Sequence, residues 1–316
     1  MSSEDRCSGV RSFVNIAQIG LLGSVVLANL VFVAKWFATV RRRPEPSRPG
    51  CIDLLIGFVT DFFDALGIGS FAPTTAIFKF RRTPADELIP GTLNVGHSPA
   101  AFAETLIFVT IVVVDPLLLA SMVVAAVIGG WLGAGIVTQL PRRAIQLTMG
   151  LALLIAATLY AASNMGWLPA GGTATSLEGW KFACAIAGNF LFGALMTAGI
   201  GLFAPCMIML ALLGMHPLSA FPIMMAACGL VQPVAGIRFL ERGRVAWQSA
   251  LGLAVGGVAG VLVAAFIVKQ LPLEALRWLV ALVVLTAALC MLYSARRGDQ
   301  PDAFTQLRAP GLRPTP

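Results

Sequence analysis

One seven-residue phrase occurs twice in this chain, each time inside a long apolar run. The copies read GIGSFAP at residues 67–73 and GIGLFAP at residues 199–205. The agreement continues downstream in Pro90 and Pro222, in the GGxxG patterns at 129–133 and 256–260, and in the QLP sequences at 139–141 and 270–272. Self-similarity at a fixed spacing indicates a duplicated unit, here of about 130 residues. The fold must therefore contain two versions of one unit.

The composition excludes a soluble globular protein. Hydrophobic residues make up 58% of the 316 positions and charged residues 12%, which leaves too few charges to cover a soluble globule of this size. Stretches with few or no charges run over residues 12–34, 116–141, 182–237, 245–268 and 278–295. Because about 20 apolar residues suffice for one helical span, the sequence predicts an all-α polytopic membrane protein.

Charge and cysteine content exclude several other classes. The net charge of +7 does not indicate nucleic-acid binding, because basic residues in membrane proteins mostly report orientation. The six cysteines show no CxxC spacing, and most lie in or beside apolar segments, where free cysteine behaves as a small hydrophobe. We therefore expect no disulfide framework, no metal site and no cofactor.

The basic residues predict that the segment 51–78 enters the membrane and returns. A single crossing would place the basic residues at 79–82 opposite the arginines at 41–48, against the positive-inside rule. A hairpin broken at its glycines avoids this conflict, since each arm is short for a full span. Spans at roughly 87–114, 116–138 and 143–163 complete a first repeat over residues 49–163.

The second repeat is predicted over residues 180–297, after an outer loop at 164–179. It contains a hairpin at about 180–213 and spans near 217–238, 246–268 and 273–295. One hairpin plus three crossings is an odd number, so two copies in series must face opposite ways, as in the inverted-topology repeats of secondary transporters. Residues 1–48 are predicted to form an extra N-terminal span with a basic cytoplasmic linker, and residues 298–316 a disordered cytoplasmic tail.

The predicted substrate site lies at the two repeated motifs, residues 67–73 and 199–205, which interrupt their helices. Their glycines can leave helical geometry, and the proline fits the first turn of the resumed helix, whose unpaired N–H groups and positive dipole end can bind an anion. The alternative is that the glycines only permit close helix packing. The predicted substrate-binding residues are Gly67, Gly69, Ser70, Thr74, Thr75, Asn94, His97, Gly199 and Gly201.

Three intramembrane carboxylates, Asp61, Asp64 and Glu104, are the predicted proton-coupling residues. Such groups are costly in a bilayer and are functional candidates by default. Asp61 and Asp64 are one helical turn apart, and Asn94, His97 and Glu104 share a face of the next helix. His97 and Glu104 form a proton relay or, alternatively, a buried network that holds helices together. The second repeat lacks these polar residues. Its corresponding positions hold Gly193 for Asp61, Met196 for Asp64, Ala226 for Asn94, Gly229 for His97 and Gly236 for Glu104.

A second functional class stays open. The DxxD spacing of Asp61 and Asp64 resembles a magnesium-binding pair, which would suit an intramembrane metal-dependent enzyme. One acidic cluster without a second makes this the alternative rather than the main hypothesis. A channel is less favoured, because broken helices in inverted halves suit alternating access.

Two longer sequences identify a family resemblance. They are GFVTDFFDALGIGSFAPTTAIFKF at residues 57–80 and IPGTLNVGHSPAAFAETLIF at residues 89–108. With the repeated break, they make the chain similar to the TauE/SafE sulfite-exporter family of permeases over about residues 50–297. The breaks contain fewer glycines than the three or four in a row usual in that family.

The resemblance implies a secondary transporter in the bacterial inner (plasma) membrane. We therefore expect a multi-pass permease, not an enzyme, that moves a small anion such as sulfite, a sulfonate or a related organic anion, coupled to protons. The expected partners are that anionic solute and the lipid bilayer, without nucleic acid. Self-association into a homo-oligomer is left open.

Overall fold

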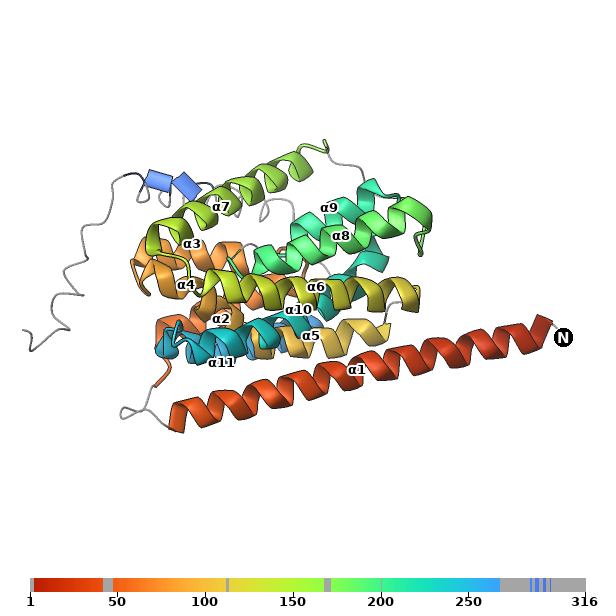
Figure 1. The fold of residues 1–316 in the computed structure, drawn as a ribbon, viewed down its shortest axis with the longest axis horizontal. Coiled ribbons are helices and arrows are strands. Elements are labelled where there is room, and N and C mark those ends of the chain that lie inside the picture. The colour runs from red at the N-terminus through yellow and green to blue at the C-terminus, as the bar shows by residue number, and fades with distance from the viewer. Residues whose placement is uncertain are drawn as a thin grey trace, which may run out of the picture.

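The computed structural model is a bundle of helices (Figure 1). It describes residues 3–41, 48–111, 114–167, 172–199 and 201–267, with the single residues 285, 288, 289, 292, 293 and 296. The predicted C-terminal tail at 298–316 and nearly all of the predicted last span at 273–295 lie outside the described residues.

The helices follow one another in a similar order in the two halves. The first half contains α1 (Ser3–Arg41), α2 (Cys51–Asp64), α3 (Phe71–Arg81), the short 3₁₀ helix η1 (Asp86–Leu88), α4 (Ile89–Gly96), α5 (Ser98–Ile111), α6 (Pro116–Val137) and α7 (Arg142–Asn164). The second contains α8 (Gly179–Met196), α9 (Phe203–Leu212), α10 (Pro217–Glu241) and α11 (Trp247–Ile267). Thus α8 to α11 correspond to α2, α3, α4 with α5, and α6.

Six helices of the described chain are long and apolar enough to cross a membrane. They include the segments Ile19–Arg41, Pro116–Val137, Arg142–Leu159, Gly179–Met196, Ser219–Glu241 and Trp247–Phe266. Many of their large apolar side chains are exposed to the surroundings rather than packed inside, as expected for lipid-facing surfaces. The predicted all-α polytopic membrane fold is confirmed.

Each broken helix folds back as a hairpin. Arg81 Nη1, at the end of α3, donates to Asp53 Oδ1, at the start of α2, at 2.6 Å. In the second half Lys181 Nζ, at the start of α8, donates to the Leu213 carbonyl, just after α9, at 3.0 Å. The arms α3 and α9, of 11 and 10 residues, reach about 15 Å each, so the chain turns back within the bundle.

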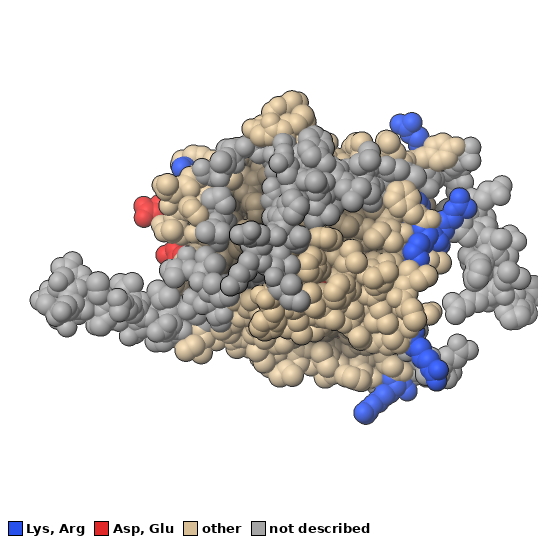
Figure 2. All heavy atoms as spheres, turned by 180° about the vertical axis from the view of Figure 1, so that it is seen from behind, with Lys and Arg blue, Asp and Glu red and all other residues tan. Residues whose placement is uncertain are grey.

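The two hairpins lie toward opposite ends of the bundle. Figure 1 shows α3 near the end where α1 finishes and α9 toward the end where α1 begins. Figure 2, the view from behind, shows lysine and arginine side chains gathered mainly at one end, which is the end of α3 in Figure 1. This charge distribution supports the predicted cytoplasmic side. The inverted-topology relation of the two halves stays a prediction.

The repeated GGxxG pattern interlocks the two halves. On α11, a Cβ at Gly256 or Gly260 would collide with the backbone carbonyl of Leu54 or Phe58 on α2. On α6, a Cβ at Gly129 would likewise collide with a backbone carbonyl, that of Phe190 on α8. Each GGxxG helix therefore packs on the first hairpin arm of the other half, where small residues let backbones approach closely.

The predicted span at 87–114 is divided. Helix α4 ends at Gly96, His97 follows it, and α5 begins at Ser98. Pro99 has no N–H group, so the Val95 carbonyl loses its i+4 donor and the helix is interrupted. The expectation of one continuous helix is therefore wrong, and the interruption places His97 between two helical segments.

Helix α1, the extra N-terminal span, packs along α10. Asn29 Nδ2 donates to the Gly229 carbonyl at 3.0 Å, and Phe32 is buried where a Cβ at Gly236 would touch its ring. An ion pair of 2.8 Å between Lys35 and Glu241 lies near the ends of both helices. These contacts attach α1 to the second half of the bundle.

The glycine packing predicts the effect of one added methyl group. We expect Gly256→Ala to destabilise the protein by about 1–3 kcal/mol, because the carbonyl of Leu54 cannot move aside without shifting α2. The measurement is the thermal unfolding midpoint in detergent. Gly23→Ala on α1 is the control, since a Cβ there meets nothing within 4 Å; equal midpoints for the two variants would contradict the packing.

Candidate functional site

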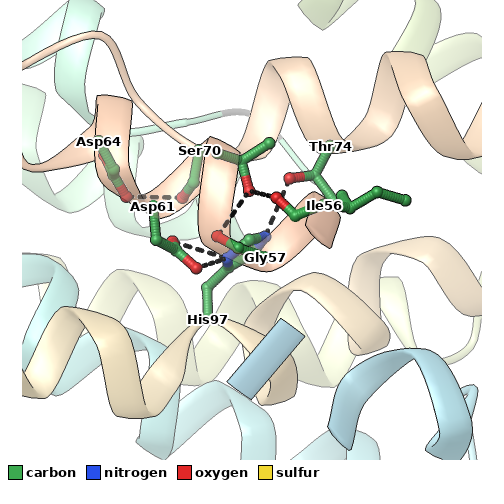
Figure 3. Close-up of polar contacts among 8 residues, drawn as sticks. Ile56, Gly57, Asp61, Asp64, Ser70, Thr74 and His97 are labelled. Carbon is green, nitrogen blue, oxygen red and sulfur yellow. Dashed lines mark hydrogen bonds and ion pairs between the residues drawn. The ribbon is translucent and has the colours of Figure 1, made fainter. Parts of the chain in front are cut away.

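A buried chain of hydrogen bonds joins α2, α3 and the interruption between α4 and α5. His97 Nδ1 lies 2.8 and 2.9 Å from the two carboxylate oxygens of Asp61. His97 Nε2 lies 3.1 Å from Thr74 Oγ1. The three side chains are fully buried, and Figure 3 shows Asp61 and Thr74 on the two sides of the His97 ring. In the neutral ring with Nδ1 donating to Asp61, Nε2 accepts from the Thr74 hydroxyl.

A second hydrogen bond crosses the first break. Asp64 is the last residue of α2 and Ser70 immediately precedes α3. Ser70 Oγ donates to Asp64 Oδ2 at 2.6 Å (Figure 3). Between them Gly67 and Gly69 have φ of 88° and 90°, values that glycine adopts without steric cost. Gly199 repeats this geometry in the second break with φ of 92°.

The two breaks meet inside the protein. A Cβ built on Gly201 would lie 3.7 Å from the Cβ of Phe71, the first residue of α3. The Phe71 ring in turn lies with its centroid 5.6 Å from that of His97. Leu202 and Phe203, at the start of α9, are buried as well. The N-terminal ends of α3 and α9 therefore converge beside the Asp61–His97–Thr74 chain.

Helix α11 makes room for Asp61. A Cβ at Gly257 would overlap the Asp61 carboxylate, so the absence of a side chain at that position lets Asp61 sit between α11 and His97. Ala100, on α5, lies 3.1 Å from the same hypothetical Cβ. The second half therefore contributes to the polar chain through the shape of its helix.

Several buried oxygen atoms near these elements have no hydrogen-bond partner among the described residues. They are Asp64 Oδ1, Thr75 Oγ1, Asn94 Oδ1, Ser98 Oγ, both carboxylate oxygens of Glu104, and Gln232 Oε1. Buried polar atoms normally have a partner, so this group indicates a place for water, a proton or a solute. The carboxyl groups of Asp61, Asp64 and Glu104 also lie close enough to interact electrostatically.

The structure brings most of the predicted site residues into one region. Ser70 is hydrogen-bonded to Asp64, and His97 is hydrogen-bonded to Asp61 and Thr74. Asn94 uses its amide nitrogen on the Pro90 carbonyl of its own helix, at 2.8 Å. Thr75 and Glu104 are buried without such bonds among the described residues.

The predicted break glycines pack against apolar side chains. A Cβ at Gly67 would approach Phe221, and one at Gly199 would approach Met149 and Leu93. The positive φ of these two residues therefore favours glycine, and the neighbouring side chains leave little room for a Cβ. The assignment of the predicted site residues to substrate and proton binding stays a prediction.

Two further candidates escaped the sequence analysis. Ser98 directly follows His97 and precedes Pro99. As a polar residue beside Asn94 and His97, it could have been predicted from the sequence as a site residue. Gln232 is a polar residue in the apolar helix α10, next to Pro233. Their oxygen atoms become notable only because the fold buries them without a partner among the residues that the structure describes.

The two carboxylates proposed as a metal-binding pair, those of Asp61 and Asp64, already make contacts with other residues. Both carboxylate oxygens of Asp61 face His97 Nδ1, and Asp64 accepts from Ser70. Within the described segments, no group of three or more His, Cys, Asp or Glu side chains is arranged to hold a metal ion.

The buried Asp61–His97 pair predicts strong coupling between two substitutions. Asp61→Ala or His97→Ala alone leaves a buried polar partner unsatisfied, a change that costs about 3–5 kcal/mol for buried pairs. We expect the double variant to be destabilised by clearly less than the sum of the two. Urea or thermal unfolding in detergent measures this double-mutant cycle.

The control cycle combines His97→Ala with Asp115→Ala. Asp115 caps α6 by accepting from the Leu118 N–H at 2.7 Å and shares no hydrogen bond or ion pair with His97 among the described residues, so the effects should add within about 0.5 kcal/mol. Full additivity in the Asp61–His97 cycle would contradict the pairing.

The comparison with known proteins agrees with the predicted resemblance. The family described as "Sulfite exporter TauE/SafE" matches residues 181–315, and the resemblance inferred from the sequence is confirmed there. No curated protein and no solved structure matches the chain. The family match indicates a membrane transporter.

Proposed function

We propose that this protein, a transporter of the TauE/SafE type, is a secondary permease that moves a small anion across the inner membrane, coupled to protons. The anions considered are sulfite, a sulfonate or a related organic anion. The observation that carries the proposal is the convergence of two broken helices, with the partly buried Gly201 beside the buried Phe71. Paired interruptions of this kind mark the binding sites of secondary transporters.

The ends of α3 and α9 supply the anion site. The first N–H groups of each helix have no intrahelical acceptor, and each N-terminus carries part of a positive charge. Ser70 and Thr74 lie at the first break, where their hydroxyl groups contact Asp64 and His97. To donate to the anion instead, each hydroxyl group would have to leave its present acceptor. Because Cα–Cβ bonds tilt toward a helix N-terminus, the side chains of Thr74 and Thr75 extend back toward the break.

The buried carboxylates supply the coupling to protons. Glu104 has both oxygens buried and unpartnered within the described structure, and an ionised carboxylate in that state is costly. An anion held nearby repels these carboxylates and so favours their protonation. By reciprocity of linkage, a proton on Glu104 or Asp64 favours the anion, and the two move together.

Access from the two sides would alternate through contacts at the ends of the hairpins. At the basic end, Asp86 accepts from Lys79 at 2.9 and 3.0 Å and from Gln146 at 2.7 Å. At the opposite end, backbone bonds join Ala174 to Gly214 and to the His216 N–H. Opening one end while the other stays paired would expose the site to one side at a time.

Filling the space between the breaks tests the site. In proteoliposomes holding the purified protein, we compare uptake of labelled sulfite, sulfate, a sulfonate and a small carboxylate with and without a pH gradient. Gly201→Leu should abolish uptake, because its side chain would occupy the region facing Phe71. Gly201→Ala is the matched control, since a Cβ there makes an ordinary contact of 3.7 Å, and should retain uptake. Unchanged uptake in a folded Gly201→Leu protein would sink the site assignment.

Neutralising Glu104 tests the coupling. We expect Glu104→Gln to retain exchange of the anion between the two sides of the vesicle and to lose acceleration by a pH gradient. Glu241→Gln is the control, because Glu241 is partly exposed and paired with Lys35. A gradient response in Glu104→Gln equal to that of the unmodified protein would remove Glu104 from the coupling.

A further inference from the structure

Pro233 removes a backbone donor from the interior of α10. This helix contains two prolines, Pro222 and Pro233, within its length. Because proline has no N–H group, the carbonyl four residues before it loses its normal helical partner. For Pro233 that carbonyl belongs to Gly229, a buried residue. A buried carbonyl group without a donor is costly, so the Gly229 carbonyl needs a partner from outside its own helix.

The first half shows the hydrogen bond that α10 lacks. Gly229 and Pro233 correspond to His97 and Ala101 in the first repeat. There the Ala101 N–H donates to the His97 carbonyl at 2.9 Å. The first repeat therefore makes, between neighbouring backbone groups, a bond that proline excludes from the second.

The side chain of Asn29, on α1, supplies a replacement donor. Its Nδ2 donates to the Gly229 carbonyl at 3.0 Å and to the Val25 carbonyl of its own helix at 2.9 Å. The amide nitrogen has two hydrogen atoms, and its two neighbours are both acceptors, which fixes the orientation of the amide group. Asn29 is only 6% exposed, so the bond is shielded from the surroundings.

The same turn of α10 contacts the residue next to Glu104. Thr105 Oγ1, on α5, is hydrogen-bonded to the Met225 carbonyl at 2.7 Å, and a Cβ at Gly229 would overlap Thr105 Oγ1. Met225 and Gly229 lie about one helical turn apart, so Thr105 packs on the turn that α1 holds. A displacement of this turn would therefore displace Thr105 and the neighbouring Glu104.

We propose that Asn29 is a positioning residue, which replaces the N–H group that Pro233 lacks and so holds α10 in place beside Glu104. Through this bond α1, which precedes the duplicated unit, stabilises the arrangement of helices around the buried carboxylates. The packing of Phe32 on α10 and the ion pair of Lys35 attach α1 to the same helix, but they satisfy no backbone group. The effect on transport rests on the function proposed above, whereas the hydrogen bond does not.

A double-mutant cycle with Pro233→Ala tests the replacement. Asn29→Leu keeps the approximate size of the side chain but leaves the Gly229 carbonyl without a donor. We therefore expect the thermal unfolding midpoint in detergent to fall by about 3 °C or more. Pro233→Ala copies Ala101 of the first half and returns an N–H group to that carbonyl. In this background, Asn29→Leu should lower the midpoint by less than half as much.

Two controls separate this bond from general packing between α1 and α10. Pro222→Ala returns an N–H group to a different carbonyl of the same helix, so Asn29→Leu should keep its full effect in that background. Phe32→Leu alters only packing and should lower the midpoint equally with and without Pro233→Ala. Hydrogen exchange gives an independent measurement: exchange in α10 around Gly229 should rise in Asn29→Leu and return when Pro233→Ala is added.

Proteoliposomes test the effect on transport. They exchange labelled sulfite, or the labelled sulfonate if the unmodified protein does not move sulfite. The maximal rate per folded protein should fall several-fold in Asn29→Leu and recover when Pro233→Ala is added, because Glu104 is displaced with the turn at Gly229. The concentration for half-maximal exchange should stay unchanged, since Asn29 makes its hydrogen bonds away from the starts of α3 and α9.

The outcomes separate this inference from the proposed function. Equal effects of Asn29→Leu with and without Pro233→Ala would overturn the replacement, whatever the vesicles transport. If Asn29→Leu yields no folded protein, recovery by Pro233→Ala supports the replacement and failure to recover contradicts it. An unchanged maximal rate in folded Asn29→Leu would overturn the positioning of Glu104. If the vesicles exchange none of the anions, the proposed function and the effect on transport both fail, while the unfolding midpoints still decide the hydrogen bond.

Discussion

The proposed anion site depends on the backbone amides at two helix starts inside a membrane protein. A helix that starts in the bilayer interior has N–H groups that neither water nor the helix itself can satisfy. The chain creates this situation twice, at Phe71 and Phe203, and the fold brings the two starts together. A solute with acceptor oxygens would satisfy both ends at once, and this is the physical basis of the proposed binding site.

The close approach of helices holds these starts in place. Glycines on α6 and α11 let each helix lie against backbone carbonyls of the other half, so neither hairpin packs mainly on its own repeat. The packing of α11 on α2 also affects the buried polar residues, because Gly257 on α11 leaves the space that Asp61 occupies beside His97. A shift of α11 relative to α2 would therefore disturb the buried pair, which gives one route by which the two halves influence each other.

The two halves share the same backbone break but differ in the polar side chains around it. The second half keeps the positive-φ glycine at Gly199 but has Leu202 and Cys206 where the first has Ser70 and Thr74. Sequence comparison of the halves predicted that polarity belongs to the first. It placed the aspartates and the His97 stripe on separate helices without joining them, since contact between residues 61 and 97 depends on how α2 packs against the interrupted helix. The interruption at Pro99 is a local effect and could have been predicted from the sequence. The apolar length of the segment instead favoured a single continuous span.

Much of this protein was determined by the sequence alone, because the responsible forces act over a few residues. Apolar length specified the membrane helices, the positive φ available to glycine located the breaks, and the distribution of arginines indicated sidedness. Only the tertiary structure decided that the breaks meet, that Asp61 binds His97, and that Ser98 and Gln232 are buried with an unpartnered oxygen. These contacts join residues far apart in the chain, and no local pattern specifies which helix faces will pack together.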